Sequence, residues 1–253
     1  MKILNRWFTT LATLVAISLI TGCATSGNPA EQNDPFEKFN RSVLTFNLES
    51  DRLLLKPVAK AYDRHLPQPV KTGVNNFFSN LWEPMTIAND LLQGKIGYAA
   101  QDTMRFVANS TLGVAGIFDV AKDMNMPRRK EDFGQTLAVW GVPEGPYLML
   151  PLLGPSTLRD AAGLIPQYQY GDLVSGLDSP ERIYAGGLRA VDTRSRLLDA
   201  EDVFELQPDK YLFLREVYRS DRENLIYDGD PPAEDGEDSG DGLIDELLED
   251  EQE

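Results

Sequence analysis

The stretch DPFEKFNRSVLTF, residues 34–46, decides the expected fold. Its apolar side chains recur every three to four residues, which is the period of one face of an α-helix: Phe36, Phe39, Val43 and Phe46. The dipeptide Asp34-Pro35 before them is typical of a helix start. The stretch therefore predicts an amphipathic helix.

Similar apolar stripes follow toward the C-terminus, and proline and glycine divide them into pieces. Lys56-Pro57 opens a short helix, and Pro67 ends it. Pro84 is expected to start a new helix, which Gly94 should terminate. A last helix is expected near Pro208 to Leu225, which carries a further apolar stripe.

The middle of the chain, from Gly113 to Gly187, is too rich in proline and glycine for long helices. Its short apolar pieces are either buried connections or segments that line a cavity at membrane depth. No alternation of polar and apolar residues persists long enough for a sheet. The fold class predicted is mainly α, a single domain over residues 34–227 of short, broken, amphipathic helices with Pro/Gly-rich turns.

The N-terminal segment indicates export. Lys2 and Arg6 precede an uncharged, mainly apolar run from Trp7 to Ile20, which is shorter than the ~20 residues that span a bilayer. An aliphatic residue and two small residues then lead into Cys23, and this resembles the lipobox of bacterial lipoproteins.

The resemblance implies a signal peptide at 1–22, lipidation of Cys23 and a polar tether at 23–33. The alternative is an ordinary signal peptide with an incidental cysteine. Cys23 is the only cysteine, so the chain has no intramolecular disulfide. Ala24, the residue after it, is compatible with an outer-membrane destination.

The net charge of −16 is concentrated at the C-terminal end. Residues 228–253 hold 13 acidic and no basic side chains, so the rest of the chain carries only −3. Such a segment is expected to be a disordered acidic tail, although four apolar residues within it could form a helix that docks a basic partner. The near-neutral body offers no basic stripe for neutralising phosphates, which disfavours nucleic-acid binding.

Catalytic chemistry has no support in the sequence. His65 is the only histidine and the cysteine is committed to lipid, so neither a His/Cys metal site nor a Cys-His dyad can form within one chain. A G-x-S-x-G nucleophile motif and a phosphate-binding glycine loop are both absent. We therefore expect no enzyme activity and no cofactor. A surface phospholipase that uses His65 is the weakest alternative.

Several stretches from residue 34 onward resemble the MlaA (VacJ) family of outer-membrane lipoproteins. They occur in the family's order and spacing over roughly residues 34–227: DPFEKFNR (34–41), LPQPV (66–70), NDLLQG (89–94), DFGQTL (132–137) and GPSTLRD (154–160).

The resemblance implies a helical lipoprotein in the inner leaflet of the outer membrane, arranged around an amphipathic channel. It implies passive removal of phospholipids that have strayed into the outer leaflet and their transfer to a periplasmic carrier similar to MlaC, which is linked to an inner-membrane ABC transporter. It also implies association with a trimeric porin. The alternative function is a lipid-anchored scaffold that binds a porin or envelope component without conducting lipid.

On this basis we expect a hairpin at the pore mouth over residues 133–145, including Phe133, Gly134, Gly141 and Gly145, with the glycines first of all as turn residues. The first helix is expected to form part of the gate or wall through three residues: Asn40, Phe46 and Asn47. The alternative for the two asparagines is that they hydrogen-bond to core backbone. Arg159-Asp160 is expected to form an ion pair that orders the adjacent turn.

Overall fold

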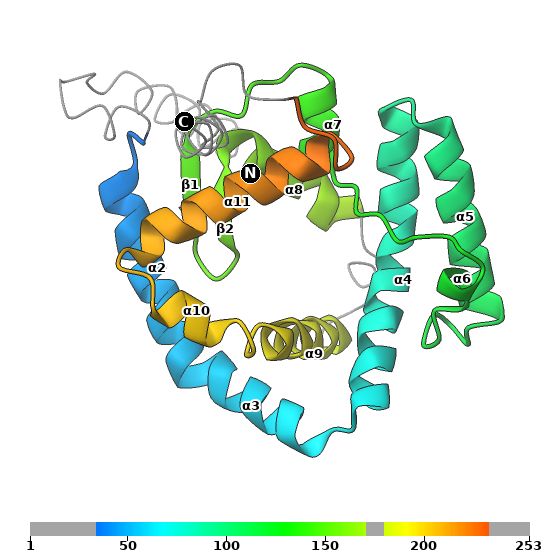
Figure 1. Cartoon of the computed structure of the whole chain (residues 1–253), viewed down its shortest axis with the longest axis horizontal. Helices are drawn as coiled ribbons and strands as arrows, with labels where there is room; N and C mark the ends of the chain where they lie inside the picture. Colours follow the sequence, from blue (N-terminus) through cyan, green and yellow to red (C-terminus); the bar gives the residue numbers. More distant parts are fainter. Residues whose placement is uncertain (1–33, 171–179, 233–253) are drawn as a thin grey trace, which may run out of the picture. The chain divides into compact units, whose positions relative to one another are not determined.

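A computed structural model describes residues 34–170 and 180–232 of the chain (Figure 1). The predicted signal peptide, Cys23, the tether and most of the acidic tail lie outside these residues. The chain separates into two compact units, Met1–Glu37 and Lys38–Glu253, and the description below concerns the second.

Helices dominate the described residues, as the sequence predicts. The elements in chain order are α2 (Glu37–Ser50), the π-helical turn η1 (Asp51–Leu55), α3 (Lys56–His65), α4 (Gln68–Leu92), α5 (Ile96–Thr111), α6 (Val120–Asp123), α7 (Phe133–Val139), β1 (Tyr147–Leu150), β2 (Gly154–Thr157), α8 (Leu158–Tyr170), α9 (Glu181–Arg196), α10 (Glu201–Glu205) and α11 (Lys210–Ile226).

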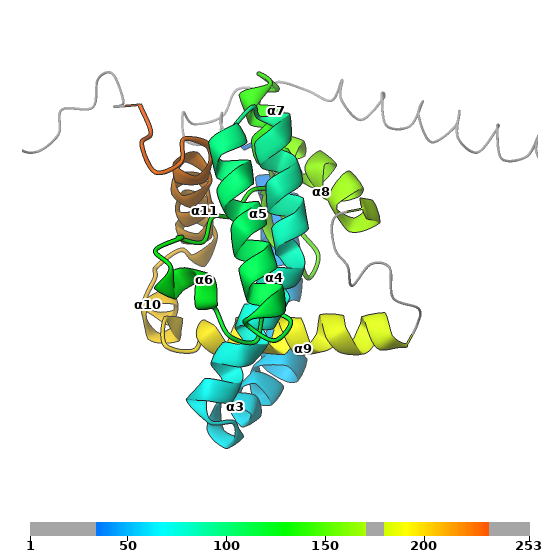
Figure 2. The same ribbon diagram turned by 90° about the vertical axis from the view of Figure 1, so that its right-hand side faces the viewer.

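The prediction that Pro84 starts a new helix is wrong, because α4 continues through it. Proline removes one backbone hydrogen bond and normally kinks a helix. Here α4 is held along its length by α5, its most extensive helix partner, and the two lie side by side (Figure 2). Gly94 does end the helix, with the positive φ of +77° that this position favours.

A two-stranded antiparallel hairpin was not expected from the sequence. Tyr147 of β1 pairs with Thr157 of β2, and Leu150 pairs with Gly154 at the closed end. Each strand has only four residues, so the alternation of buried and half-buried side chains in β1 is too short to be recognised as a strand pattern.

The elements of Lys38–Glu253 contact one another in a series (Figure 1). Helix α3 lies against α9, α9 against α4, and α4 against both α5 and α7. Helix α7 in turn contacts α8 and α11, and α11 contacts β2. Side chains of α2 complete the series by binding the hairpin, as described below.

The side chains are partitioned in the opposite way from a typical water-soluble domain. Among the described residues, 20 buried side chains are polar or charged and only 11 are apolar, while 34 large apolar side chains are exposed. The apolar core is a small cluster formed by Leu44, Tyr147, Met149 and Tyr211. Polar interactions therefore organise most of the interior.

Candidate functional site

The hairpin is held by two asparagines of α2. Asn40 is fully buried, donates to the carbonyl of Tyr147 at 3.0 Å and accepts from the amide of Met149 at 2.9 Å. Asn47 donates to the carbonyl of Leu150 at 2.9 Å and accepts from the amide of Leu152 at 2.8 Å. Both asparagines therefore bind hairpin backbone, as the alternative reading of them predicts.

The seven-residue spacing of Asn40 and Asn47 explains this arrangement. Two turns of helix separate them on one face, which places both amides along the edge of β1 and its loop. Each amide satisfies one carbonyl and one N–H that a second strand would otherwise have to pair. Helix α2 therefore fixes the position of the hairpin.

A pocket of about 220 Å³ opens beside the hairpin and is amphipathic. Its lining combines apolar residues of the hairpin and α8 with polar residues of the hairpin, the N-cap of α7, α8 and α11: Leu150, Leu153, Pro155, Leu164, Ser156, Asp132, Asp160, Tyr218 and Arg222. This volume is below the ~300–1,000 Å³ typical of pockets for drug-sized ligands. The pocket can therefore hold a small polar group but not a whole lipid.

Ion pairs form the polar side of the pocket. Arg222 donates to both oxygens of Asp132 at 2.6 and 2.7 Å and to Asp160 at 2.9 Å. Tyr218 donates to the second oxygen of Asp160 at 2.5 Å. The expected ion pair of Arg159 with Asp160 is also present, at 3.1 Å.

These contacts keep both carboxylates charged. Burial works against ionisation of Asp132 and Asp160, but the adjacent guanidinium of Arg222 outweighs it and holds the pKa of each below its usual range. Burial also works against the charge on Arg222, yet hydrogen bonding to Asp132 raises the pKa of the guanidinium. Burial, followed by the negative charge of Asp160, raises the pKa of Tyr218.

The hairpin predicted over residues 133–145 is wrong in position. Phe133 to Val139 form helix α7, whose first turn is capped by Asp132 through the amide of Gln135 at 2.9 Å. The strands begin only at Tyr147. Asp132 was not expected to cap a helix, although an Asp three residues before a Gln fits the signature of a helix start.

The three glycines of this region have different roles. Gly141 and Gly145 have φ of +84° and +72°, so they are turn residues as predicted. Gly134 lies inside α7, where a Cβ atom would be 2.4 Å from Arg222 Nη2 and 2.5 Å from Asp160 Oδ1. Because Gly134 has no side chain, Arg222 and Asp160 can form their ion pair directly beside α7. The expectation that Gly134 is a turn residue is therefore wrong.

The two predicted aromatic residues do not line the pocket. Phe133 packs edge-to-face on Trp140 with 6.0 Å between ring centroids. The Phe46 side chain is 53 % exposed on α2. The predicted site residues thus converge on the hairpin and pocket through Asn40, Asn47 and Gly134, whereas Phe46 contributes to the apolar exterior.

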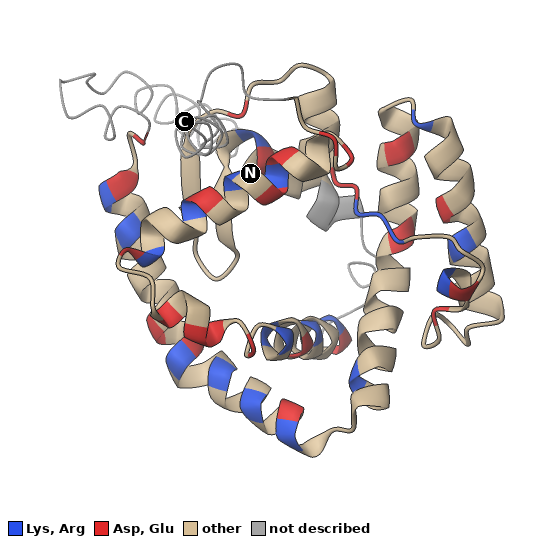
Figure 3. Ribbon diagram, viewed as in Figure 1, with Lys and Arg blue, Asp and Glu red and all other residues tan. Residues whose placement is uncertain are grey.

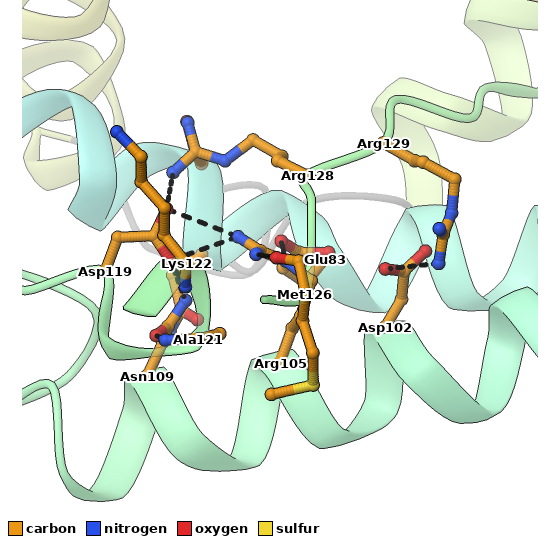
Figure 4. A network of polar contacts seen from close by, with 12 residues as sticks. Glu83, Asp102, Arg105, Asn109, Asp119, Ala121, Lys122, Met126, Arg128 and Arg129 are labelled. Atoms are coloured by element: carbon orange, nitrogen blue, oxygen red, sulfur yellow. Dashed lines mark hydrogen bonds and ion pairs between the residues drawn. The ribbon is translucent and has the colours of Figure 1, made fainter. Parts of the chain in front are cut away.

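A second polar cluster, which was not expected from the sequence, joins α4, α5 and the residues on either side of α6 (Figure 4). Arg105 of α5 is fully buried and binds Glu83 of α4 at 3.3 Å, Asp119 at 3.2 Å and the carbonyl of Met126. Its signal in the sequence is the helical spacing of three polar residues on one face of α5: Asp102, Arg105 and Asn109.

One acid in the interface of α4 with α5, Asp90, holds a proton. Asp90 and Asp102 are both fully buried, and no described donor hydrogen-bonds to either carboxylate oxygen of Asp90. Burial, followed by the adjacent carboxyl group of Asp102, raises the pKa of Asp90 to about 7. Asp90 therefore keeps its proton in the folded protein up to about pH 7.

The described residues contain no group of three or more His, Cys, Asp or Glu side chains that could hold a metal ion. Within the same residues, no helix combines the length and apolar character needed to cross a membrane. The ring Nδ1 atom of His65 lies 2.8 Å from the carbonyl of Ala61, one turn earlier in α3.

A helical fold with a polar interior, an apolar exterior and an amphipathic pocket defines a protein suited to apolar surroundings. The model of the MlaA lipoprotein family matches residues 32–225, so the chain belongs to this family.

Curated relatives carry the name intermembrane phospholipid transport system lipoprotein MlaA. That of Escherichia coli K12 is 36 % identical over 82 % of this chain and 84 % of its own length. That of Haemophilus influenzae is 31 % identical over 87 % and 91 %, respectively. A solved structure described as the structural basis for maintenance of bacterial outer membrane lipid asymmetry has a TM-score of 0.69, with 34 % identity, over 76 % of this chain and 98 % of that one.

Proposed function

We propose that this chain is an outer-membrane lipoprotein that passively removes mislocalised phospholipids from the outer leaflet, passes them to a periplasmic carrier and so maintains lipid asymmetry. It is a transport lipoprotein and not an enzyme, as its family membership indicates. Its site of action is the outer membrane, where Cys23 carries the lipid anchor on the periplasmic face.

This proposal rests on the distribution of side chains, since many polar side chains are buried and many large apolar side chains are exposed. Exposed apolar surface costs roughly 25 cal/mol per Å² in water, and contiguous patches beyond a few hundred Å² mark interaction surfaces. With 34 large apolar side chains exposed among the described residues, the stable surroundings are apolar. A bilayer leaflet supplies such surroundings on several sides of the domain at once.

The amphipathic pocket supports a lipid path beside the hairpin. A phospholipid that moves between membranes needs polar contacts for its head group and apolar contacts for its tails. The pocket offers Asp160, Tyr218 and Arg222 on one side and Leu150 and Leu153 on the other. Its volume suits a head group, while the tails would extend along the exposed apolar surface outside it.

The proposed partners are those that the resemblance to the MlaA family implies, and the names of the relatives support a place in an intermembrane phospholipid transport system. A trimeric porin would hold the domain in the outer membrane, and a carrier similar to MlaC would receive the lipid and deliver it to an inner-membrane ABC transporter. A nucleotide-binding motif is absent from the sequence, so the step at this protein is proposed to be passive.

The test is the phospholipid content of the protein purified in mild detergent, in the natural form and as Cys23→Ala. We expect the unlipidated form to retain phospholipid and to lose it when a purified periplasmic carrier is added. A lipid-free Cys23→Ala form that is folded and soluble would instead favour the scaffold function.

The matched pair of variants for this assay lies on α2. Asn47→Ala removes both hydrogen bonds to the hairpin loop and should reduce lipid release to the carrier. Thr45→Ala, two residues earlier, removes only a local bond to the carbonyl of Arg41 at 2.9 Å and should release lipid normally. Equal lipid release by the two variants would show that the anchoring of the hairpin by Asn47 does not affect the lipid path.

A further inference from the structure

Basic side chains occupy every fourth position of η1 and α3: Arg52, Lys56, Lys60 and Arg64 (Figure 3). Side chains four residues apart lie on the same face of a helix. The four cations therefore form a continuous basic stripe, and the expectation that the body of the chain has none is wrong.

Half of this stripe is neutralised inside the protein. Arg52 binds Glu49 at 2.7 Å, and Lys56 binds Glu201 of α10. Within the described part of the chain, neither Lys60 nor Arg64 forms a salt bridge, and both are exposed. The outer half of the stripe therefore carries two exposed positive charges that lie outside the salt bridges.

The acids nearest in sequence do not neutralise these two charges. Asp51 binds Arg194 of α9 at 2.8 Å, and Asp63 binds Lys71 of α4 at 2.5 Å. Residues 49–71 hold five basic and three acidic side chains, a local excess of positive charge in a chain whose net charge is −16. The stripe is thus a positively charged region of a chain whose net charge is negative.

An exposed apolar strip runs beside the stripe. Leu53, Leu54 and Val58 are 66 %, 71 % and 52 % exposed, whereas Ala59 and Tyr62 of α3 are buried. Helix α3 packs against α9. The free surface of η1 and α3 therefore consists of an apolar strip flanked by cations, the pattern of helices that lie in the plane of a membrane interface.

We propose that η1 and α3 lie at a bilayer surface, with Leu53, Leu54 and Val58 among the acyl chains and Lys60 and Arg64 against the phosphates of anionic phospholipids. A bilayer interface can contact the apolar strip and the basic stripe at the same time, because acyl chains and charged head groups meet there. An acidic protein would satisfy only the cations. This inference rests on the proposed function only in placing the domain at a membrane.

The test is flotation of the full chain carrying Cys23→Ala, so that the acyl anchor does not mask binding by the domain. The vesicles contain either phosphatidylethanolamine with phosphatidylglycerol, or phosphatidylcholine alone. Each cation near an anionic surface contributes about fivefold in affinity. Lys60→Gln combined with Arg64→Gln should therefore weaken binding to the anionic vesicles about 25-fold and leave binding to phosphatidylcholine unchanged.

The control variant combines Lys122→Gln with Lys130→Gln. Both lysines are exposed outside η1 and α3 and form no salt bridge within the described residues, so the change in net charge is the same. The control should bind anionic vesicles like the parent. Equal losses in the two double variants would assign the effect to net charge and overturn the proposal, as would a parent chain without preference for anionic vesicles.

A second measurement uses the lipidated full chain in nanodiscs. Backbone amides of residues 56–65 should exchange hydrogen more slowly in discs containing phosphatidylglycerol than in phosphatidylcholine discs. Exchange that is independent of the lipid would contradict the surface contact. Lipid transfer to the carrier is scored separately, so a chain that transfers lipid without this preference retains the proposed function and loses only the basic contact.

Discussion

Arg222 and Asp132 lie 90 residues apart and form two hydrogen bonds of 2.6 and 2.7 Å that join α11 to the start of α7. Asp132 also caps α7, and Arg222 also binds Asp160 of α8. One guanidinium thus connects three helices at the polar side of the pocket.

Replacing Arg222 by leucine should lower the free energy of unfolding by about 3–5 kcal/mol, because it leaves Asp132 without its counter-ion and Asp160 with Arg159 alone. The measurement is urea unfolding in mild detergent, followed by circular dichroism. Arg52→Leu is the control, since its pair with Glu49 is exposed on both sides and should be worth at most about 1 kcal/mol. Similar losses in the two variants would contradict a central role for Arg222.

Gly134→Ala should disrupt the ion pair of Arg222 with Asp160, because the added methyl group takes up the space that this pair occupies. The new methyl group would be 2.4 Å from Arg222 Nη2 and 2.5 Å from Asp160 Oδ1, so α7 and α8 must separate or the ion pair must break. We expect a loss of ~1–3 kcal/mol in the free energy of unfolding, the usual cost of overpacking.

Gly186→Ala in α9 is the matched control for this substitution. Nothing lies within 4 Å of a Cβ atom at Gly186, and glycine inside a helix costs roughly 0.5–1 kcal/mol relative to alanine. The control should therefore unfold at a slightly higher urea concentration than the parent chain. A Gly134→Ala protein as stable as this control would show that the α7–α8 contact yields easily.

The helices of this fold could be predicted because they depend on local patterns. The stripe of residues 36–46 predicts α2, and Lys56-Pro57 predicts the start of α3. Pro84 was misjudged because the effect of a proline on one hydrogen bond is local, whereas the packing of α5 that keeps α4 continuous is not. The hairpin was missed because four residues per strand are too few for periodicity to register.

The site was predicted only in part for a related reason. Asn40 and Asn47 could be singled out because their spacing places them on one face, but their partners lie more than 100 residues away. No sequence pattern joins Asp132, Asp160 and Arg222, which come from three separate helices. Spacing within one element is visible in a sequence, whereas pairing between elements is not.

Asn40→Asp is expected to destabilise the hairpin anchor by about 1–3 kcal/mol near neutral pH. An ionised carboxylate cannot donate to the Tyr147 carbonyl, and it places a charge at a fully buried position. The loss should shrink as the pH is lowered, because the protonated acid can donate again. Unfolding curves at several pH values measure this, with the exposed Asn224→Asp as control.

Asp90→Asn is expected to stabilise the protein at neutral and higher pH. The folded state holds the Asp90 proton up to about pH 7, whereas in an unfolded chain the group titrates near its model value of 3.8. The folded state therefore binds more protons than the unfolded state between these values, so stability falls as the pH rises from about 4 to about 7. Asparagine carries no titrating proton and should remove this decline.

The measurement is the free energy of unfolding from about pH 4 to pH 8 for the parent chain and for Asp90→Asn. The two should be similar at the acidic end and diverge as the parent loses stability. Asp102→Asn discriminates between the two carboxyl groups, because Asp102 also binds Arg129 at 3.1 Å and its loss leaves that guanidinium without its acid. It should therefore be less stable than Asp90→Asn throughout the range, whereas equal curves would mean that the two acids are interchangeable and that the proton does not belong mainly to Asp90.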